Sequence, residues 1–241
     1  MFFNFERRYL YIIIGILALY GLSSYLSDPK ALLGLLISIP GILIAITFHE
    51  FAHAKVADVL GDDTPRRDGR LTLNPLAHID PVGFIMLLFA HFGWGKPVQV
   101  NPRNYNRDIS MEKADCLVSL AGPLTNFILA ILFTLIYFLM YKYLRFNTNF
   151  IVSVIMQMVN YAIIINVGLG VFNLIPLPPL DGSKIIKPIL PQNAKIFFED
   201  NARIFYIVFV ILWVSGIAGN IISPLINIIV NWLFKLGSFI L

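Results

Sequence analysis

The sequence predicts an all-α polytopic membrane protein, with about six transmembrane helices and a re-entrant, β-hairpin-containing element between the second and third. Of its 241 residues, 58% are hydrophobic and only 13% are charged, whereas a soluble domain carries about a quarter charged residues. Several uncharged stretches are long enough to cross a ~30 Å hydrocarbon core. The net charge of +4 comes from basic residues scattered through loops, which is not the dense basic stripe of a nucleic-acid-binding protein.

Six apolar segments account for the expected spans. The first follows Arg7 and Arg8, and we interpret it as a retained span because no small-residue cleavage pattern of a signal peptide precedes Asp28. Short connectors between neighbouring segments make consecutive helices antiparallel. The segments are 9–26, 31–60, 115–144, 150–175, 202–218 and 221–240.

The stretch 61–113 does not have the pattern of a simple loop. Its apolar core, 82–92, is too short to span a bilayer and has proline or glycine breakers on both sides. Two flanking pieces, 70–74 and 98–101, alternate apolar and polar residues, which is typical of short β-strands. Irregular backbone at membrane depth must be buried in protein or line a water-filled cavity. We therefore expect a re-entrant element flanked by strands.

The distribution of Lys and Arg predicts the topology. With six spans, and with Lys55 and Arg203 assigned to the nearest loop, 15 of the 18 basic residues fall on the side that holds both termini, the 61–113 region and the connector 176–201. The positive-inside rule then places both termini in the cytoplasm. We expect a multi-pass protein of the cell membrane in this orientation.

The second expected span carries the pattern H-E-x-x-H at His49, Glu50 and His53. Residues four apart lie on one helix face, so both imidazoles point the same way. This spacing suits two positions of a tetrahedral zinc ion, and Glu50 can reach the attacking water as a general base. Three ionisable side chains within a span are costly unless they have partners, which disfavours a merely structural polar face.

A catalytic zinc site usually has three protein ligands. The best candidate for the third is Asp181, at the end of the run NLIPLPPLDG (173–182) that closes the fourth span. Because the second and fourth spans run in the same direction, their C-terminal halves lie at similar depth, and Asp181 can meet His49 and His53. The lone cysteine, Cys116, excludes a cysteine-based zinc cage.

Three further residues are candidates for contact with a substrate or a developing oxyanion: Asn173, Asn126 and His78. An amide within a span must find a partner, and beside zinc it could donate to an oxyanion. A helix-packing hydrogen bond is the alternative for both asparagines. For His78 the alternative is a structural role at the membrane interface.

The HEFAH motif, the run AGPLTN (121–126) and NLIPLPPLDG together resemble the site-2 protease family of intramembrane zinc metalloproteases. The segments TLNPLAHIDPVG (72–83) and GWGKPVQVNP (93–102) resemble its small prokaryotic subgroup without a PDZ or CBS domain. The resemblance covers about residues 40–190. It implies one Zn²⁺ per chain held by His49, His53 and Asp181, with Glu50 as the catalytic base.

From this resemblance we expect the chain to be a single integral membrane metalloprotease domain, 1–241. Its catalytic core is about 31–190, and 202–241 is a two-helix gate or scaffold. The expected activity is hydrolysis of peptide bonds in single-span membrane proteins or signal-peptide-like substrates. An extended substrate could add to a strand edge near Leu71 or Val98.

Two other functions use the same residues. A membrane zinc carrier could use the same ligands without hydrolysis, but no second cluster of ligands occurs on the side of Lys30 and Arg145. An inactive relative could bind membrane proteins without cleaving them, but the presence of Glu50 argues against it.

Overall fold

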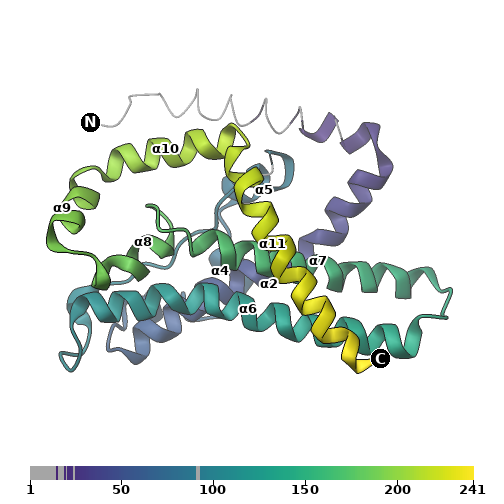
Figure 1. The fold of residues 1–241 in the computed structure, drawn as a ribbon, viewed down its shortest axis with the longest axis horizontal. Helices are drawn as coiled ribbons and strands as arrows, with labels where there is room; N and C mark the ends of the chain where they lie inside the picture. The colour runs from purple at the N-terminus through teal and green to yellow at the C-terminus, as the bar shows by residue number, and fades with distance from the viewer. Residues whose placement is uncertain (1–14, 16–18, 20, 24, 91–92) are drawn as a thin grey trace.

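The computed structural model describes residues 15, 19, 21–23, 25–90 and 93–241, and this part of the chain is helical with no β-strand (Figure 1). The all-α class is therefore confirmed. The helices are α2 (Pro29–Val59), α3 (Thr64–Arg67), α4 (Pro75–His78), α5 (Pro81–Ala90), α6 (Met111–Leu144), α7 (Phe150–Asn173), α8 (Asp181–Ile186), α9 (Gln192–Asp200), α10 (Ala202–Val214) and α11 (Ile217–Gly237). Three short 3-10 turns accompany them: η1 (Pro102–Asn104), η2 (Lys187–Ile189) and η3 (Ser238–Ile240).

Four helices among the described residues are long and apolar enough to cross a membrane: α2, α6, α7 and α11 extended by η3. They match the second, third, fourth and sixth expected spans. The expected fifth span is shorter than predicted because α10 stops after 13 residues, before Gly216, which takes a left-handed φ of 74°. A helix of that length covers only about 20 Å. The expected first span, 9–26, falls mostly outside the described residues, so the count of six stays a prediction.

The long helices begin at residues that satisfy their free backbone N–H groups. Asp28 accepts a hydrogen bond from the N–H of Lys30 (2.9 Å), directly before Pro29 at the start of α2. Asn149 does the same for the N–H of Ile151 (2.8 Å) at the start of α7. These side chains replace partners that the first helical turn lacks.

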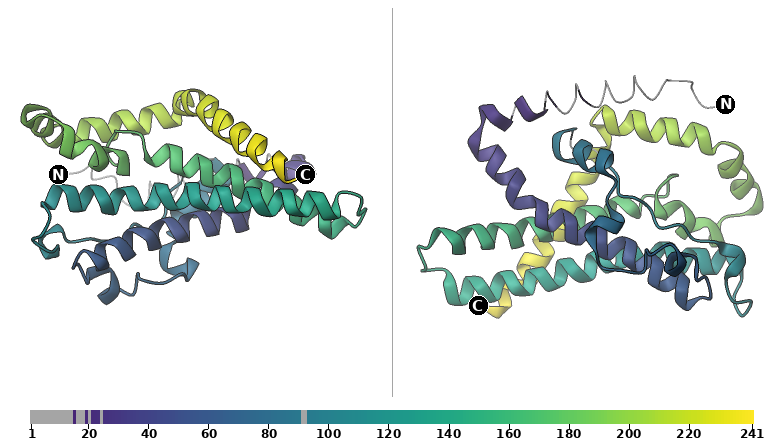
Figure 2. Two further views of the ribbon diagram at one scale, coloured as in Figure 1. Left: turned by 60° about the horizontal axis from the view of Figure 1, so that its bottom comes forward. Right: turned by 180° about the vertical axis from the view of Figure 1, so that it is seen from behind.

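The centre of the fold is the mutual packing of α2, α6 and α7, seen from three directions in Figures 1 and 2. Small residues allow close approach, as is usual between membrane helices: a Cβ on Gly41 of α2 would lie 3.0 Å from the Cα of Ala162 in α7. On the other side of α7, α11 crosses over it and over α6, where Ala130, Val167 and Ile222 share one apolar cluster.

The short β-strands predicted at 70–74 and 98–101 are wrong. The described residues show only an isolated bridge between Ile79 and Gly95. Side chains bind the backbone in and directly before the second of these segments: Arg70 donates to the carbonyls of Lys96 and Pro97, and Glu50 accepts from the N–H of Val98. The described part of the apolar core of this region lies in α5 (Pro81–Ala90), a helix of 10 residues. Its re-entrant placement stays a prediction.

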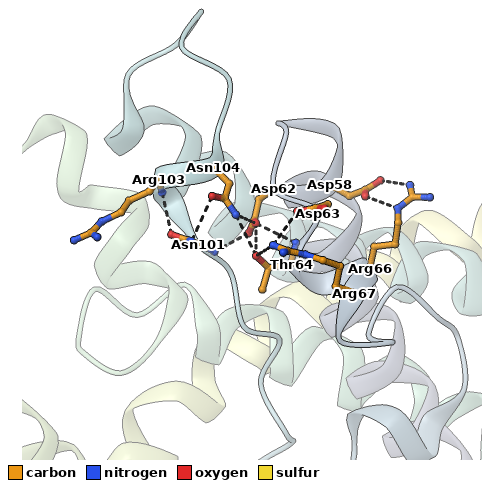
Figure 3. A network of polar contacts seen from close by, with 9 residues as sticks. All are labelled: Asp58, Asp62, Asp63, Thr64, Arg66, Arg67, Asn101, Arg103 and Asn104. Atoms are coloured by element: carbon orange, nitrogen blue, oxygen red, sulfur yellow. Dashed lines mark hydrogen bonds and ion pairs between the residues drawn. The ribbon is translucent and has the colours of Figure 1, made fainter.

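A buried carboxylate, Asp62, ties the end of α2 to the segment that leads into α6 (Figure 3). It accepts hydrogen bonds from the N–H and hydroxyl of Thr64, the N–H of Asn101 (2.6 Å) and the side-chain amide of Asn104 (2.9 Å). Burial opposes ionisation, but these hydrogen bonds outweigh it and hold the pKa of Asp62 below its usual range. The segment that crosses Glu50 at Val98 is thus anchored three residues further along.

Asp62→Asn is expected to lower the free energy of unfolding by about 1.5 to 3 kcal/mol, the contribution of hydrogen bonds to a charged group. The new NH₂ group would face the N–H of Asn101 or the donors of Thr64 and Asn104. Since the folded pKa of Asp62 lies below the ordinary value of about 3.9, its carboxylate stabilises the fold above that pH. This contribution is lost as the pH falls through the folded pKa. Thermal unfolding in detergent from pH 3 to 7 measures both effects.

The matched control is Asp63→Asn. Asp63 pairs with Arg67 at the surface, where its side chain is 60% exposed, and such pairs contribute little. Equal unfolding midpoints for the two variants would contradict the assigned role of Asp62.

Candidate metal centre

Three potential metal ligands from two distant parts of the chain converge in the structure. The Nε2 atoms of His49 and His53 lie 3.0 Å apart, and each lies 3.2 Å from Oδ2 of Asp181. Both imidazoles are buried, on the face of α2 that meets α6 and α7. His49, His53 and Asp181 are the residues that the sequence predicts as ligands, and the fold brings them into one group that could hold a metal ion.

Hydrogen bonds on the far side of each imidazole orient both rings. Nδ1 of His49 donates to the amide oxygen of Asn126 (2.7 Å), and Nδ1 of His53 donates to the carbonyl of Val118 (2.6 Å). Each ring therefore carries its proton on Nδ1 and directs the lone pair of Nε2 toward Asp181. Partners of this kind set the tautomer and raise the basicity of metal-ligating histidines.

Asp181 is the first residue of α8, which follows the turn after α7. Gly182 lets the backbone turn closely here, because a Cβ at this position would lie 2.3 Å from the carbonyl oxygen of Ile175. The Asp181 carboxylate is the acidic group that lies within reach of both Nε2 atoms. An ionised carboxylate is the form that a metal binds.

The donor set fits zinc. Ligands at the usual ~2.0–2.2 Å from a tetrahedral zinc ion lie about 3.3 to 3.5 Å from one another, close to the 3.0 and 3.2 Å separations of the three donor atoms. Two imidazole lone pairs and a carboxylate directed at one point repel one another unless a cation lies between them. Two nitrogens and one oxygen are ligands that zinc accepts in catalytic sites.

Glu50 is held beside this centre by the segment that precedes η1. Its Oε2 accepts a hydrogen bond from the N–H of Val98 (2.8 Å), and Gly95 lies near its other carboxylate oxygen. Gly95 also packs against the backbone of His78. The region 61–113 therefore covers the face of α2 that carries Glu50.

Helix α6 passes directly over the two imidazoles at Gly122. A Cβ on Gly122 would lie 2.5 Å from Nε2 of His53 and 2.7 Å from Nε2 of His49. No larger residue fits here without moving one of the two imidazoles. One turn further along α6, Asn126 binds His49. The AGPLTN run thus supplies both a close approach and a hydrogen-bond acceptor.

The structure places the other candidate residues in different settings, and Asn126 is the one that is hydrogen-bonded to His49. Asn126 is fully buried, and its amide is bound by His49, Ala45 and Asn166. Asn173, at the end of α7, donates from its side chain to the carbonyl of Leu169 (3.1 Å).

His78 is also fully buried, and its Nε2 donates to the carbonyl of Thr72 (2.7 Å). Two residues that contribute to the site, Gly122 and Asn166, are not among the site residues predicted from the sequence, although Gly122 lies within the AGPLTN run. Only Asn166 carries a signal of its own, as an amide within an apolar span.

Comparisons with known proteins agree with this geometry. Residues 37–216 match the model of Peptidase family M50. The Bacillus subtilis protein named "Putative zinc metalloprotease YwhC" is 38% identical over 204 residues, which cover 83% of this chain and 90% of that protein. The protein named "Putative zinc metalloprotease Rip2" from Mycolicibacterium smegmatis is 30% identical over 202 residues, covering 82% of this chain and 70% of that protein.

No solved structure matches the chain significantly. The family match spans most of the sequence and includes His49, His53 and Asp181. With four apolar helices that are long enough to cross a membrane, the chain is a multi-pass membrane protein. It belongs to peptidase family M50, the site-2 protease family of zinc metalloproteases.

Proposed function

We propose that this protein is an intramembrane zinc metalloprotease that hydrolyses peptide bonds of membrane-spanning substrates, with Glu50 as general base. The observation that carries the proposal is the convergence of His49, His53 and Asp181 at 3.0 to 3.2 Å beside a glutamate one residue from the first ligand. The family membership supports the same chemistry.

The residues divide the catalytic work between them. Zinc, when bound, would polarise the attacking water and the scissile carbonyl. Glu50 takes a proton from the water and delivers it to the leaving amine. The N–H of Val98 holds the Glu50 carboxylate in place through Oε2 (2.8 Å). Asn173, at the end of α7, is the candidate for holding the substrate backbone.

The lengths of the helices support a site near one boundary of the bilayer. His49 lies about 30 Å along α2 from Asp28, at 1.5 Å per residue. Asn126 lies about 27 Å along α6 from its end before Arg145. Measured from the side of Asp28 and Arg145, the centre is therefore near the far edge of a ~30 Å hydrocarbon core. Most Lys and Arg residues lie on that far side, which we assign to the cytoplasm of the cell.

A substrate must present an extended backbone to this centre, because a helix hides its carbonyl groups in internal hydrogen bonds. We therefore expect single-span membrane proteins or signal-peptide-like segments that unwind near the bilayer boundary. The backbone of the 93–101 segment beside Glu50 is the surface on which such a segment could be aligned.

The test uses the purified full-length protein in liposomes, together with a single-span membrane peptide. Removal of zinc with a chelator is expected to abolish cleavage, and added Zn²⁺ is expected to restore it. A chelator of equal strength that is already saturated with zinc is the control. Zinc flux into the liposomes without cleavage would show a carrier instead. Zinc binding with neither flux nor cleavage of any membrane peptide would show a binding protein.

A further inference from the structure

Asn166 lies in the middle of α7, fully buried, and is linked to the metal centre by a chain of side-chain amides. Its Oδ1 accepts a hydrogen bond from Nδ2 of Asn126 in α6 (3.0 Å). Oδ1 of Asn126 in turn accepts from Nδ1 of His49 in α2 (2.7 Å). Three helices are thus joined by one line of hydrogen bonds that ends on a metal ligand.

Groups that can only accept hydrogen bonds set the direction of this chain. Nδ2 of Asn166 donates to the carbonyl of Ala162 (2.8 Å), so its Oδ1 must face Asn126. Asn126 then directs its NH₂ group at Asn166 and at the carbonyl of Ala45 (3.1 Å). Oδ1 of Asn126 therefore faces Nδ1 of His49. Because this oxygen can only accept a hydrogen bond, Nδ1 of His49 must carry the proton.

The other imidazole has no such dependence. Nδ1 of His53 donates to the backbone carbonyl of Val118 (2.6 Å). A carbonyl oxygen can only accept hydrogen bonds, so this partner fixes the proton on Nδ1 of His53. The partner of His49 is an amide, which can present either its oxygen or its NH₂ group. The tautomer of His49 alone therefore depends on whatever fixes the orientation of Asn126.

We propose that Asn166 is a positioning residue that, through Asn126, keeps the proton of His49 on Nδ1 and its Nε2 lone pair available to zinc. If Asn126 turned over, its NH₂ group would face Nδ1 of His49 and the proton would move to Nε2, the metal-binding atom. The turned amide would also direct its oxygen at Oδ1 of Asn166 and at the carbonyl of Ala45. Asn166 thus supplies one of the two acceptors that oppose this rotation, and it prevents an unsatisfied buried N–H on Asn126.

The variant that isolates this contact is Asn166→Ser. A serine hydroxyl can bond to the carbonyl of Ala162 one turn back, but the shorter side chain does not reach Asn126. Asn166→Leu removes both contacts at similar volume and serves as a second variant. Thr134→Val is the matched control, because the Thr134 hydroxyl is also buried but bonds only within its own helix, to the carbonyl of Ala130 (2.7 Å).

Two measurements on the full-length protein in detergent test the proposal without any protease assay. Zinc affinity is measured by competition with a chelator, and the tautomer of His49 by ¹⁵N NMR of histidine-labelled, zinc-free protein. Loss of an outer-shell partner typically lowers metal affinity about 10- to 100-fold. We expect a loss in that range for Asn126→Leu and about 10-fold for Asn166→Ser, with a partial shift of the His49 signal to the Nε2–H form and no change at His53.

A double variant separates a positioning role from general destabilisation. Because Asn166 acts through Asn126, Asn126→Leu combined with Asn166→Ser is expected to bind zinc no more weakly than Asn126→Leu alone. Additive losses, or an Asn166→Ser protein with the zinc affinity and His49 tautomer of the unaltered chain, would overturn the proposal. The inference rests on zinc binding at this centre. If the unaltered chain did not bind zinc, the proposed function itself would fail. If the unaltered chain bound zinc but the Asn166 variants behaved like it, only the role of Asn166 would fail.

Discussion

Glu50→Gln is expected to lower peptide-bond cleavage by about 10²- to 10⁴-fold, the usual contribution of a general base, while zinc stays bound. Glutamine has nearly the same shape, and its amide oxygen can still accept the hydrogen bond from the N–H of Val98. It cannot take up the proton of the attacking water. The proposed ligands His49, His53 and Asp181 are unchanged, so zinc content per chain should equal that of the unaltered protein.

The measurement pairs a cleavage assay in liposomes with metal analysis of the same preparation. Glu112→Gln is the matched control, since Glu112 makes only a partly exposed ion pair with Lys195 (2.6 Å), at the start of α6. We expect it to cleave at the unaltered rate. Full activity of zinc-loaded Glu50→Gln would show that another group is the base.

Gly122→Ala is expected to disrupt the metal centre although residue 122 carries no ligand. The added methyl group would lie 2.5 Å from Nε2 of His53 and 2.6 Å from the ring of His49. These distances are well inside van der Waals contact, so α6 must shift or the imidazoles must rotate off their hydrogen bonds to Asn126 and Val118. A misplacement of about 1 Å at a reacting centre costs on the order of 100-fold in rate. We expect at least that loss, together with weaker zinc binding.

The control for Gly122→Ala is Gly168→Ala in α7, where the new methyl group would make only an ordinary 3.6 Å contact with Ile226. Both substitutions raise helix propensity by about 1 kcal/mol, so the difference between them reports the clash alone. Zinc affinity by chelator competition and the cleavage rate are the measurements. Equal zinc affinity in the two variants would mean that a methyl group at residue 122 does not displace the imidazoles of His49 and His53.

Local patterns in the sequence were enough to predict the helical class and most of the spans. A run of 20 or more apolar residues leaves its backbone no partner in lipid except itself, so α2, α6 and α7 follow from composition and length. The pairing of His49 with His53 follows from the helical repeat. Asp181 could be assigned because two spans in the same direction bring their C-terminal ends to one level.

The strands predicted at 70–74 and 98–101 failed for a physical reason that no local pattern contains. Alternation of apolar and polar residues shows that a segment is extended with two unlike faces, and it does not identify the partner of its backbone. In the structure that partner is a set of side chains: Arg70, Glu50 and Asp62. Glu50 and Asp62 lie outside both predicted strands, so the alternation could not reveal them.

The sequence by itself determined that this protein is a chain of membrane helices with two histidines at a spacing that suits zinc and a glutamate between them. Only the tertiary structure decided how those histidines are protonated and how closely the helices approach them. The tautomer of His49 depends on Asn126 and Asn166, and the room for both rings depends on Gly122. These contacts join side chains of three separate helices, α2, α6 and α7. Hydrogen-bond direction and steric clearance are properties of atoms in contact, and no single segment encodes them.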